Sequence, residues 1–275
     1  MGLSQLLRRF PRWNAAYRGY REFKQMQRPP VKTPGGFWFV GNKLMQSGTF
    51  EPEETRIVEE LLSNVDVLIN VGANVGYYCC IALQRKKKVI AFEPMPRNLE
   101  FLMKNIIFNG TEEFIEVFPL ALSSRSGIAK FYGAGTGASL IQGWAGQSEE
   151  DLTLVPMSTL DTILGNRMHG TRCLVVVDVE GAELAMLQSA SNLLSNTPRP
   201  IWLVEISVNE HQPTGILINP NLVETFKIFF DAGYHAITAK RESRSIHLQE
   251  VQQVASTGID TLKTHNFVFR PAEHE

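Results

Sequence analysis

The 275-residue sequence is 44% hydrophobic, and its 27 Lys and Arg are balanced by 28 Asp and Glu, which gives a formal net charge of −1. Such a chain can bury a substantial core, and its near-neutral charge gives no indication of a nucleic-acid partner. No apolar stretch reaches the roughly 18 to 20 residues needed to span a bilayer. The three cysteines form no disulfide framework, so a cytoplasmic protein is expected.

Positive charge is concentrated at the N-terminal end, where residues 1–28 contain seven Lys or Arg and one acidic residue. The apolar residues of this segment recur at helical spacing, and Pro11 is expected to break or kink the helix. We therefore predict a basic amphipathic extension over residues 1–30. It packs on the main domain, associates with a second subunit, touches an anionic membrane peripherally or stays disordered, and the sequence leaves these alternatives open. The apolar positions are Leu3, Leu6, Phe10, Trp13, Tyr17 and Tyr20.

A run of proline and glycine places a domain boundary near residue 30, so residues 31–275 are predicted to form the main domain. In its core, from about residue 65 to residue 240, short unbroken apolar runs alternate with helical patterns. Strands of this kind are buried on both faces of a sheet, and their alternation with helices predicts an α/β fold built from parallel βαβ units. The predicted strands are 67–71, 89–92, 115–122, 173–179, 201–206, 234–238 and 266–270, and helices are predicted to begin near residues 51, 75, 96, 182 and 221.

Residues 123–165 interrupt this alternation. They contain two β-like segments, Ile128–Tyr132 and Leu154–Met157, separated by a loop rich in Gly and Ser. We predict that this insertion covers the edge of the sheet where ligands bind, and that Trp144 and the loop 133–150 act as a lid.

The first predicted strand ends in the turn Asn70-Val71-Gly72-Ala73-Asn74-Val75-Gly76. Gly72 permits a tight turn, and Gly76 permits close approach of a ligand to a helix N-terminus. Glu93 ends the next strand, 21 residues after Gly72, where its carboxylate can accept both hydroxyl groups of a ribose.

The turn lacks the glycine pattern of a dinucleotide-binding fold. That pattern requires Gly-x-Gly-x-x-Gly, but Asn74 and Tyr77 stand at the last two glycine positions. Without a diphosphate to hold, this turn suits an adenosyl-amino-acid cofactor better than NAD. An ordinary βα turn that uses glycine only for its geometry is the alternative.

Five motifs in chain order resemble those of the FkbM methyltransferase family. The resemblance spans about residues 65–240 and implies a Rossmann-like class I methyltransferase fold, with a mostly parallel seven-stranded sheet and helices on both faces. It also implies S-adenosylmethionine as the cofactor and O-methylation of hydroxyl groups on sugars, glycolipids or natural products. The motifs are Val71–Gly76, Phe92–Pro94, Pro119–Ser123, Ser158–Asp161 and Val177–Glu183.

The motifs indicate which residues hold the cofactor. The adenine ring is expected at the end of the third strand, and Ser139 lies in a glycine- and serine-rich loop that either lines the cleft or is an ordinary loop. The family usually has Asp at position 70, near the aminoacyl end of the cofactor, so the neutral Asn70 is expected to weaken cofactor binding. The predicted cofactor contacts are Asn70, Gly72, Asn74, Gly76, Glu93, Pro94, Ala121, Leu122, Ser139, Asp178 and Glu180.

Three carboxylates, Asp178, Glu180 and Glu183, cluster at the carboxyl end of a buried strand, where open α/β sheets bind ligands. They repel one another unless a positive group lies between them, such as a sulfonium, an ammonium, an arginine or a Mg²⁺ ion. Asp178 and Glu180 are expected to project to the same side of an extended strand. Glu183 alternatively caps a helix that starts near Gly181. No spacing of Cys and His indicates a zinc site.

Methyl transfer to a hydroxyl requires alignment and a general base. The candidates are Asp178, Glu205 at the end of its strand and His211 in the loop beyond, and the choice among them stays open. We expect an O-methyltransferase that acts on a small molecule or a glycan, with the loops 133–150 and 207–220 facing the acceptor. N-methylation of a small molecule or protein, and a catalytically silent cofactor-binding module, remain alternatives. A nucleic-acid methyltransferase is disfavoured by the acidic body of the chain.

Overall fold

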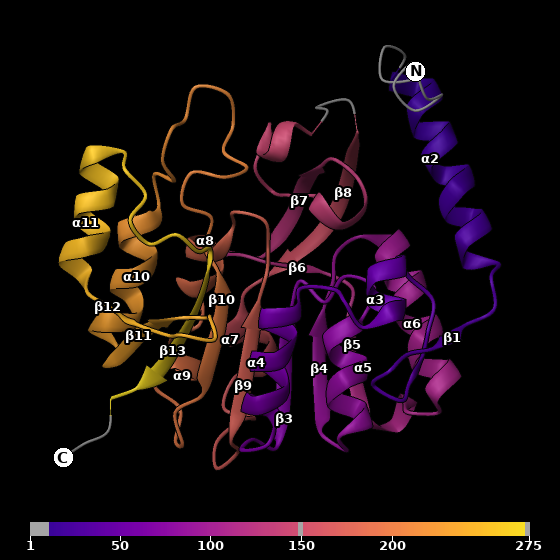
Figure 1. The fold of residues 1–275 in the computed structure, drawn as a ribbon, viewed down its shortest axis with the longest axis horizontal. Coiled ribbons are helices and arrows are strands. Elements are labelled where there is room, and N and C mark those ends of the chain that lie inside the picture. Colours follow the sequence, from indigo (N-terminus) through magenta and orange to yellow (C-terminus); the bar gives the residue numbers. More distant parts are fainter. Residues whose placement is uncertain (1–10, 148–150, 273–275) are drawn as a thin grey trace.

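The computed structural model describes residues 11–147 and 151–272, which form three layers with a sheet in the middle (Figure 1). The strands of the central sheet are β3 (Val67–Val71), β4 (Lys88–Phe92), β5 (Ile115–Phe118), β9 (Cys173–Val177), β10 (Ile201–Glu205), β11 (Tyr234–Thr238), β12 (Ser245–Ile246) and β13 (Asn266–Pro271). Their order is β12-β11-β13-β10-β9-β3-β4-β5. The strands from β10 to β5 are parallel, whereas β13 is antiparallel to both β10 and β11.

The predicted α/β class with a mostly parallel sheet is confirmed, but the predicted number of seven strands is wrong. β12 adds an eighth strand at the edge, where Ser245 and Ile246 pair with β11. The segment is only two residues long, so it carries no apolar periodicity that could reveal it in the sequence.

Helices cover both faces of this sheet (Figure 1). One face carries α4 (Pro52–Leu62), α5 (Tyr77–Gln84) and α6 (Pro96–Asn109), and the other carries α7 (Leu160–Leu164), α8 (Glu183–Leu187), α9 (Ser191–Leu194), α10 (Leu222–Asp231) and α11 (Leu248–Thr257). Successive strand side chains point to opposite faces, so Ile69 and Val71 enter one core while Leu68 enters the other. The unbroken apolar runs of the sequence follow from this double burial.

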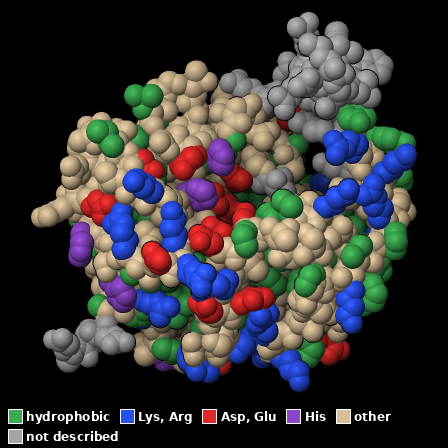
Figure 2. Space-filling model, in the orientation of Figure 1, with side chains coloured by type: hydrophobic (Ala, Val, Ile, Leu, Met, Phe, Trp, Pro, Cys, Tyr) green, Lys and Arg blue, Asp and Glu red, His purple; other side chains and the backbone are tan. Residues whose placement is uncertain are grey.

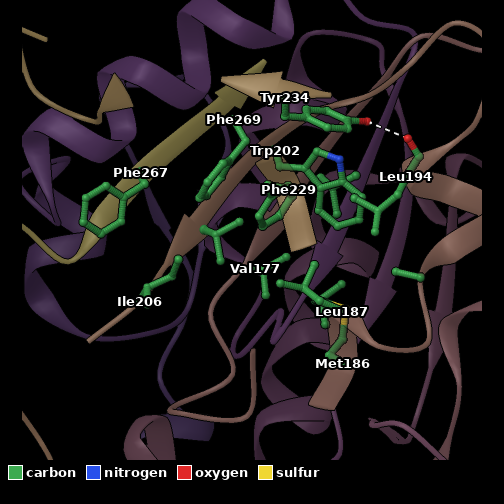
Figure 3. Close-up of a cluster of buried hydrophobic side chains, with 14 of the residues drawn as sticks. Val177, Met186, Leu187, Leu194, Trp202, Ile206, Phe229, Tyr234, Phe267 and Phe269 are labelled. Carbon is green, nitrogen blue, oxygen red and sulfur yellow. Dashed lines mark hydrogen bonds between the residues drawn. The ribbon is translucent and has the colours of Figure 1, made fainter. Parts of the chain in front are cut away.

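The larger core packs aromatic rings beside β10 and β13 (Figure 3). Phe229 of α10 stacks on Phe269 of β13 with ring centroids 3.8 Å apart, and Trp202 of β10 meets Phe229 edge-on. The buried hydroxyl of Tyr234 donates a hydrogen bond to the carbonyl of Leu194 at 3.1 Å. This packing fixes the antiparallel strands against β10 and thereby positions the carboxyl end of β10.

A second sheet of three strands lies at the upper end of the central strands in Figure 1, in the order β6-β8-β7. It consists of β6 (Ala121–Leu122), β7 (Gly127–Tyr132) and β8 (Leu152–Ser158). The predicted strand over 115–122 is therefore wrong in its length, because the chain leaves the central sheet after Phe118 and pairs with β8 from Ala121 onward. The connecting loops contain the short 3-10 helices Glu112–Phe114, Gly135–Gly137 and Trp144–Gly146.

The N-terminal part begins with α2 (Pro11–Met26), followed by β1 (Val31–Lys32), β2 (Trp38–Phe39) and α3 (Lys43–Ser47). α2 begins at Pro11, a residue that fits the first position of a helix. The predicted apolar positions Leu3, Leu6 and Phe10 lie outside the described residues. Within residues 11–147 and 151–272, no helix combines the length and apolar character that a membrane crossing requires.

Candidate active site

The turn after β3 comes into close contact with the end of β9. Gly72 has a φ of +83°, and a Cβ at this position would lie 1.8 Å from the carbonyl oxygen of Asp178, so only glycine fits. Its N–H donates to the carbonyl of Phe92 at 2.9 Å, which ties the turn to β4. Gly76 has a different role, because a Cβ at this position would lie only 3.1 Å from the Leu102 side chain of α6. Gly72 thus forms part of the ligand cleft, whereas Gly76 allows two helices to pack closely.

Glu93 follows β4 and is only 4% exposed. One carboxylate oxygen accepts a hydrogen bond from the backbone N–H of Asn74 at 2.8 Å. The other accepts from the N–H of Met95 at 2.8 Å and from the Asn98 amide at 3.2 Å. Burial raises the pKa of Glu93 to about 7, although these hydrogen bonds oppose the shift. Three donors therefore hold the carboxylate at the position where a ribose contact is predicted.

A cleft of about 530 Å³ opens between the turn after β3, the end of β9 and the small sheet. Eight of the eleven predicted cofactor contacts line it, and the three that do not are Asn70, Gly76 and Ser139. An apolar slot beside a carboxylate is what an adenosine requires. The apolar walls include Phe92, Leu120, Ala121, Leu122, Phe131 and Leu140, and Pro94 also lines the cleft.

A smaller cavity of about 380 Å³ adjoins this cleft and shares Gly72, Asn74 and Asp178 with it. Asn70 lines the smaller cavity, and its amide donates to the sulfur of Cys79 at 3.5 Å. Asn70, the residue that departs from the family pattern, therefore lines the smaller cavity and not the cleft.

Glu51 lies at the mouth of this smaller cavity and was not singled out by the sequence, in which it only marks the start of a helix. It directly precedes α4 in a left-handed conformation, with φ 38° and ψ 67°, and its carboxylate accepts a hydrogen bond from the Tyr78 hydroxyl at 2.8 Å. Partial burial raises the pKa of Glu51, and Tyr78 opposes this effect. A left-handed conformation is strained for any residue other than glycine, and such strain concentrates at functional sites. That signal is visible only in the folded chain.

Asp178, Glu180 and Glu205 meet Glu51 at the carboxyl ends of β9 and β10. The Oδ1 atom of Asp178 is buried and has no hydrogen-bond partner among the described residues. Burial, followed by the neighbouring carboxylates, raises the pKa of both Asp178 and Glu205 well above the usual range. Figure 2 shows acidic side chains gathered in a hollow of this face. A positively charged ligand would stabilise such a cluster.

The turn after β9 is held by the loop from the small sheet. Asp178 and Glu180 do not project from one strand as expected, because β9 ends at Val177 and Glu180 has a φ of +53°. The Ser139 hydroxyl donates to the Glu180 carbonyl at 2.6 Å, and the Trp144 indole N–H donates to the Glu180 carboxylate at 2.7 Å. Ser139 therefore positions the turn without lining the cleft, and the buried Trp144 packs against the same turn at Gly181.

Glu183 is the first residue of α8, close to the predicted start of this helix. Its buried carboxylate accepts a hydrogen bond from the Gly181 N–H at 2.9 Å, in the turn that precedes the helix, and does not cap the helix. Burial raises its pKa to about 7. In the part of the chain that the structure describes, no group of three or more His, Cys, Asp and Glu is arranged to hold a metal ion, so the Mg²⁺ hypothesis finds no support.

The loop after β10 meets the loop 133–147 beside this cluster. The exposed ring of His211 packs edge-on against Trp144 with centroids 6.1 Å apart, and its carbonyl accepts a hydrogen bond from the N–H of Ala145 at 2.7 Å. The structure thus brings Asp178 and Glu205 together and places His211 on the outer side of the same region.

The mostly parallel sheet with helices on both faces and the close turn after β3 are those of a Rossmann-like class I methyltransferase fold. The model of the Methyltransferase FkbM domain matches residues 70–236, and the chain belongs to this family. The hexuronic acid methyltransferase AglP of Haloferax volcanii is 30% identical over 175 residues, which are 62% of this chain and 70% of that protein.

Two solved structures are similar to this chain at low sequence identity. Methyltransferase FkbM from Methylobacillus flagellatus KT is 17% identical with a TM-score of 0.43, and the match covers 92% of this chain and 58% of that chain. Fibrillarin from Aeropyrum pernix, which was solved with bound S-adenosylmethionine, is 10% identical with a TM-score of 0.39, and the match covers 76% of this chain and 67% of the other. The chain therefore spans little more than half the length of the first of these proteins.

Proposed function

We propose that the protein transfers the methyl group of S-adenosylmethionine to a hydroxyl group of a sugar, glycolipid or natural product. The observation that carries the proposal is the buried, unpartnered oxygen of Asp178, which lies where the cleft and the smaller cavity join. With its adenosine in the cleft, S-adenosylmethionine would direct its sulfonium and ammonium groups toward this carboxylate. The sugar acceptor is supported by the name of the relative from Haloferax volcanii.

Residues on both sides of the Gly72 turn would hold the cofactor. Glu93 would accept the ribose hydroxyls, and the β6 residues Ala121 and Leu122 would flank the adenine. Asp178 and Glu51 would attract the cationic end, where bound S-adenosylmethionine supplies an electrophilic methyl group. In this assignment Glu51 provides the negative charge that position 70 lacks, because both residues line the same cavity.

We assign the general base to Glu205. It ends β10, the neighbour of β9, close to Asp178 and outside the walls of the cleft and the smaller cavity. Burial and the neighbouring carboxylates raise its pKa well above the usual range while the cluster holds no cation. A positive charge bound beside Asp178 lowers that pKa, which leaves a carboxylate that accepts the proton lost by the acceptor hydroxyl. Asp178 itself and His211 are the alternatives.

Calorimetry with S-adenosylhomocysteine tests the cofactor assignment. Glu93→Ala is expected to lower the affinity at least about tenfold, because it removes a charged partner of two hydroxyl groups. Glu100→Ala, at an exposed position of α6, is the matched control and should bind as the unmodified chain does. Equal binding by Glu93→Ala would remove the ribose assignment.

Product analysis tests the reaction. Incubation with methyl-labelled cofactor and sugars that contain a hexuronic acid is expected to give a methyl ether, which resists mild alkali. An alkali-labile methyl ester or an N-methyl product would contradict transfer to a hydroxyl, and cofactor binding without turnover of any acceptor would favour a silent module. Glu205→Gln is expected to reduce kcat by about 10² or more while cofactor affinity is retained. An unchanged kcat would return the assignment to Asp178 or His211.

A further inference from the structure

A surface formed by the second half of α2, the β1–β2 hairpin and α6 presents large apolar side chains to solvent. Seven of them are between 42% and 62% exposed, and they come from all three elements. We refer to this region as the α2–α6 surface. Its apolar members are Tyr20, Phe23, Val31, Trp38, Met103, Ile107 and Phe108.

Hydrogen bonds join the three elements into one continuous surface. Arg97 donates to the carbonyl of Gly19 at 3.3 Å, and Lys104 donates to the carbonyl of Met26. Arg97 and Lys104 are seven residues apart on α6, and Gly19 and Met26 are seven residues apart on α2. The two helices therefore run side by side in the same direction. Asn109, at the end of α6, bonds the backbone of β2 both as acceptor and as donor.

Positive charge is interleaved with these apolar side chains. The segment 11–32 contains six Lys or Arg and a single Glu. Arg21, Lys24, Arg28 and Lys32 are all exposed, and none of the four forms an ion pair with a described acidic residue. Lys24 lies over the ring of Tyr20 at 4.9 Å. Figure 2 shows blue and green side chains intermixed on the side of the molecule that carries α2 and α6.

We propose that the α2–α6 surface docks the protein on a membrane that contains anionic lipids. Basic residues attract negatively charged headgroups within a Debye length, while aromatic and aliphatic side chains enter the interfacial layer, so the combination of both fits this partner. Neither cavity of the active site is lined by the apolar residues of this surface, so docking leaves the site open.

Other occupants fit less well. In a symmetric dimer the same patch would meet itself, which would place the unpaired positive charges face to face. A nucleic acid would match the charge, but Val31, Met103 and Ile107 offer it neither stacking nor hydrogen bonds. Both are distinguishable outcomes of the experiment below.

Flotation of the full chain with vesicles tests the proposal. The chain is expected to bind vesicles of phosphatidylcholine with phosphatidylglycerol, and added salt should weaken this binding. Binding to vesicles of phosphatidylcholine alone should be at least tenfold weaker, because the basic residues then have no anionic headgroups to attract them. The double variant Arg21→Glu/Lys24→Glu should lose at least about tenfold in partitioning. Tyr20→Ser/Phe23→Ser should lose a comparable amount, because the apolar contribution is removed.

The matched control is Lys130→Glu/Lys227→Glu, which reverses two exposed lysines on β7 and α10 and should bind vesicles as the unmodified chain does. All variants should bind S-adenosylhomocysteine equally. Equal partitioning into both kinds of vesicle, or equal loss in the control, would overturn the proposal. Two further results would overturn it. One is a dimer that light scattering detects without vesicles and that the variant Arg21→Glu/Lys24→Glu dissociates. The other is tighter binding of the chain to a single-stranded oligonucleotide than to vesicles.

Discussion

Asn70 and Glu51 face the same small cavity from different elements, one at the end of β3 and the other just before α4. The family resemblance places a carboxylate at position 70, and in this chain the amide there donates to Cys79. In the proposed binding mode, Glu51 would supply the negative charge at the cationic end of the cofactor, and the Tyr78 hydroxyl donates a hydrogen bond to its carboxylate.

The first prediction tests this exchange of charge. Glu51→Gln is expected to lower the affinity for S-adenosylmethionine about tenfold, roughly 1.4 kcal/mol, because a charged contact becomes neutral. Adding Asn70→Asp to that variant should restore most of the affinity, since a carboxylate then returns to the same cavity. Calorimetry measures both, with Glu53→Gln as the control at an exposed position in the first turn of α4. Failure of the second substitution to rescue the first would contradict the exchange.

The residues that sequence reasoning could identify are those at strand ends. Glu93 and Asp178 follow unbroken apolar runs, and the carboxyl ends of parallel strands meet at one edge, so pattern alone brings them together. Glu51 has no such marker, because its position depends on how α4 packs beside the β3 turn. Ser139 is predicted to contact the cofactor, but it does not line the cleft, and its hydroxyl contacts the Glu180 carbonyl in a left-handed turn that the sequence does not reveal.

At the scale of elements, the site depends on how closely the β3 turn approaches the end of β9. Gly72→Ala is expected to reduce the free energy of unfolding by about 3 kcal/mol or more, because its Cβ would overlap the carbonyl of Asp178 in a left-handed backbone. Gly110→Ala, at the left-handed end of α6 with no atom within 4 Å of the Cβ, should cost only about 1 kcal/mol. Urea unfolding measures both, and equal costs would show that only the backbone conformation matters.

The order of elements follows from the sequence, but their exact ends do not. The alternation of apolar runs and helical patterns predicts the parallel strands, because each run is buried by helices on both faces. The run 115–122 looks like one strand, yet its two halves pair with different sheets on either side of Pro119. Apolar periodicity does not show which strand another strand pairs with. The small sheet that completes the cleft could therefore not be distinguished from the large sheet in the sequence.

At the scale of the whole molecule, buried carboxyl groups determine how stability depends on pH. Burial raises the pKa of Glu93 and Glu183 from the ordinary 4.5 to about 7. Between these values the folded chain binds more protons than the unfolded chain, so the free energy of unfolding falls as the pH rises through this window. The pKa of Glu250 is lowered by Arg244, and that of Glu210 is also lowered, so the stability that they contribute is lost only in more acidic solution.

The last prediction follows from this decrease in the free energy of unfolding with rising pH. Without ligand, the protein is expected to melt several degrees higher at about pH 6 than at about pH 8, because the ionisation of each group between these pH values removes roughly 1.4 kcal/mol of stability. Glu183→Gln keeps this buried side chain neutral and should reduce the difference, whereas Asp66→Asn, at an exposed position outside the site, should not. S-adenosylmethionine favours the ionised carboxylates, so its stabilising shift in Tm should be larger at about pH 8 than at about pH 6. Scanning calorimetry measures these values, and a ligand-free Tm that rises over this pH range would show that the carboxyl groups are not held at raised pKa.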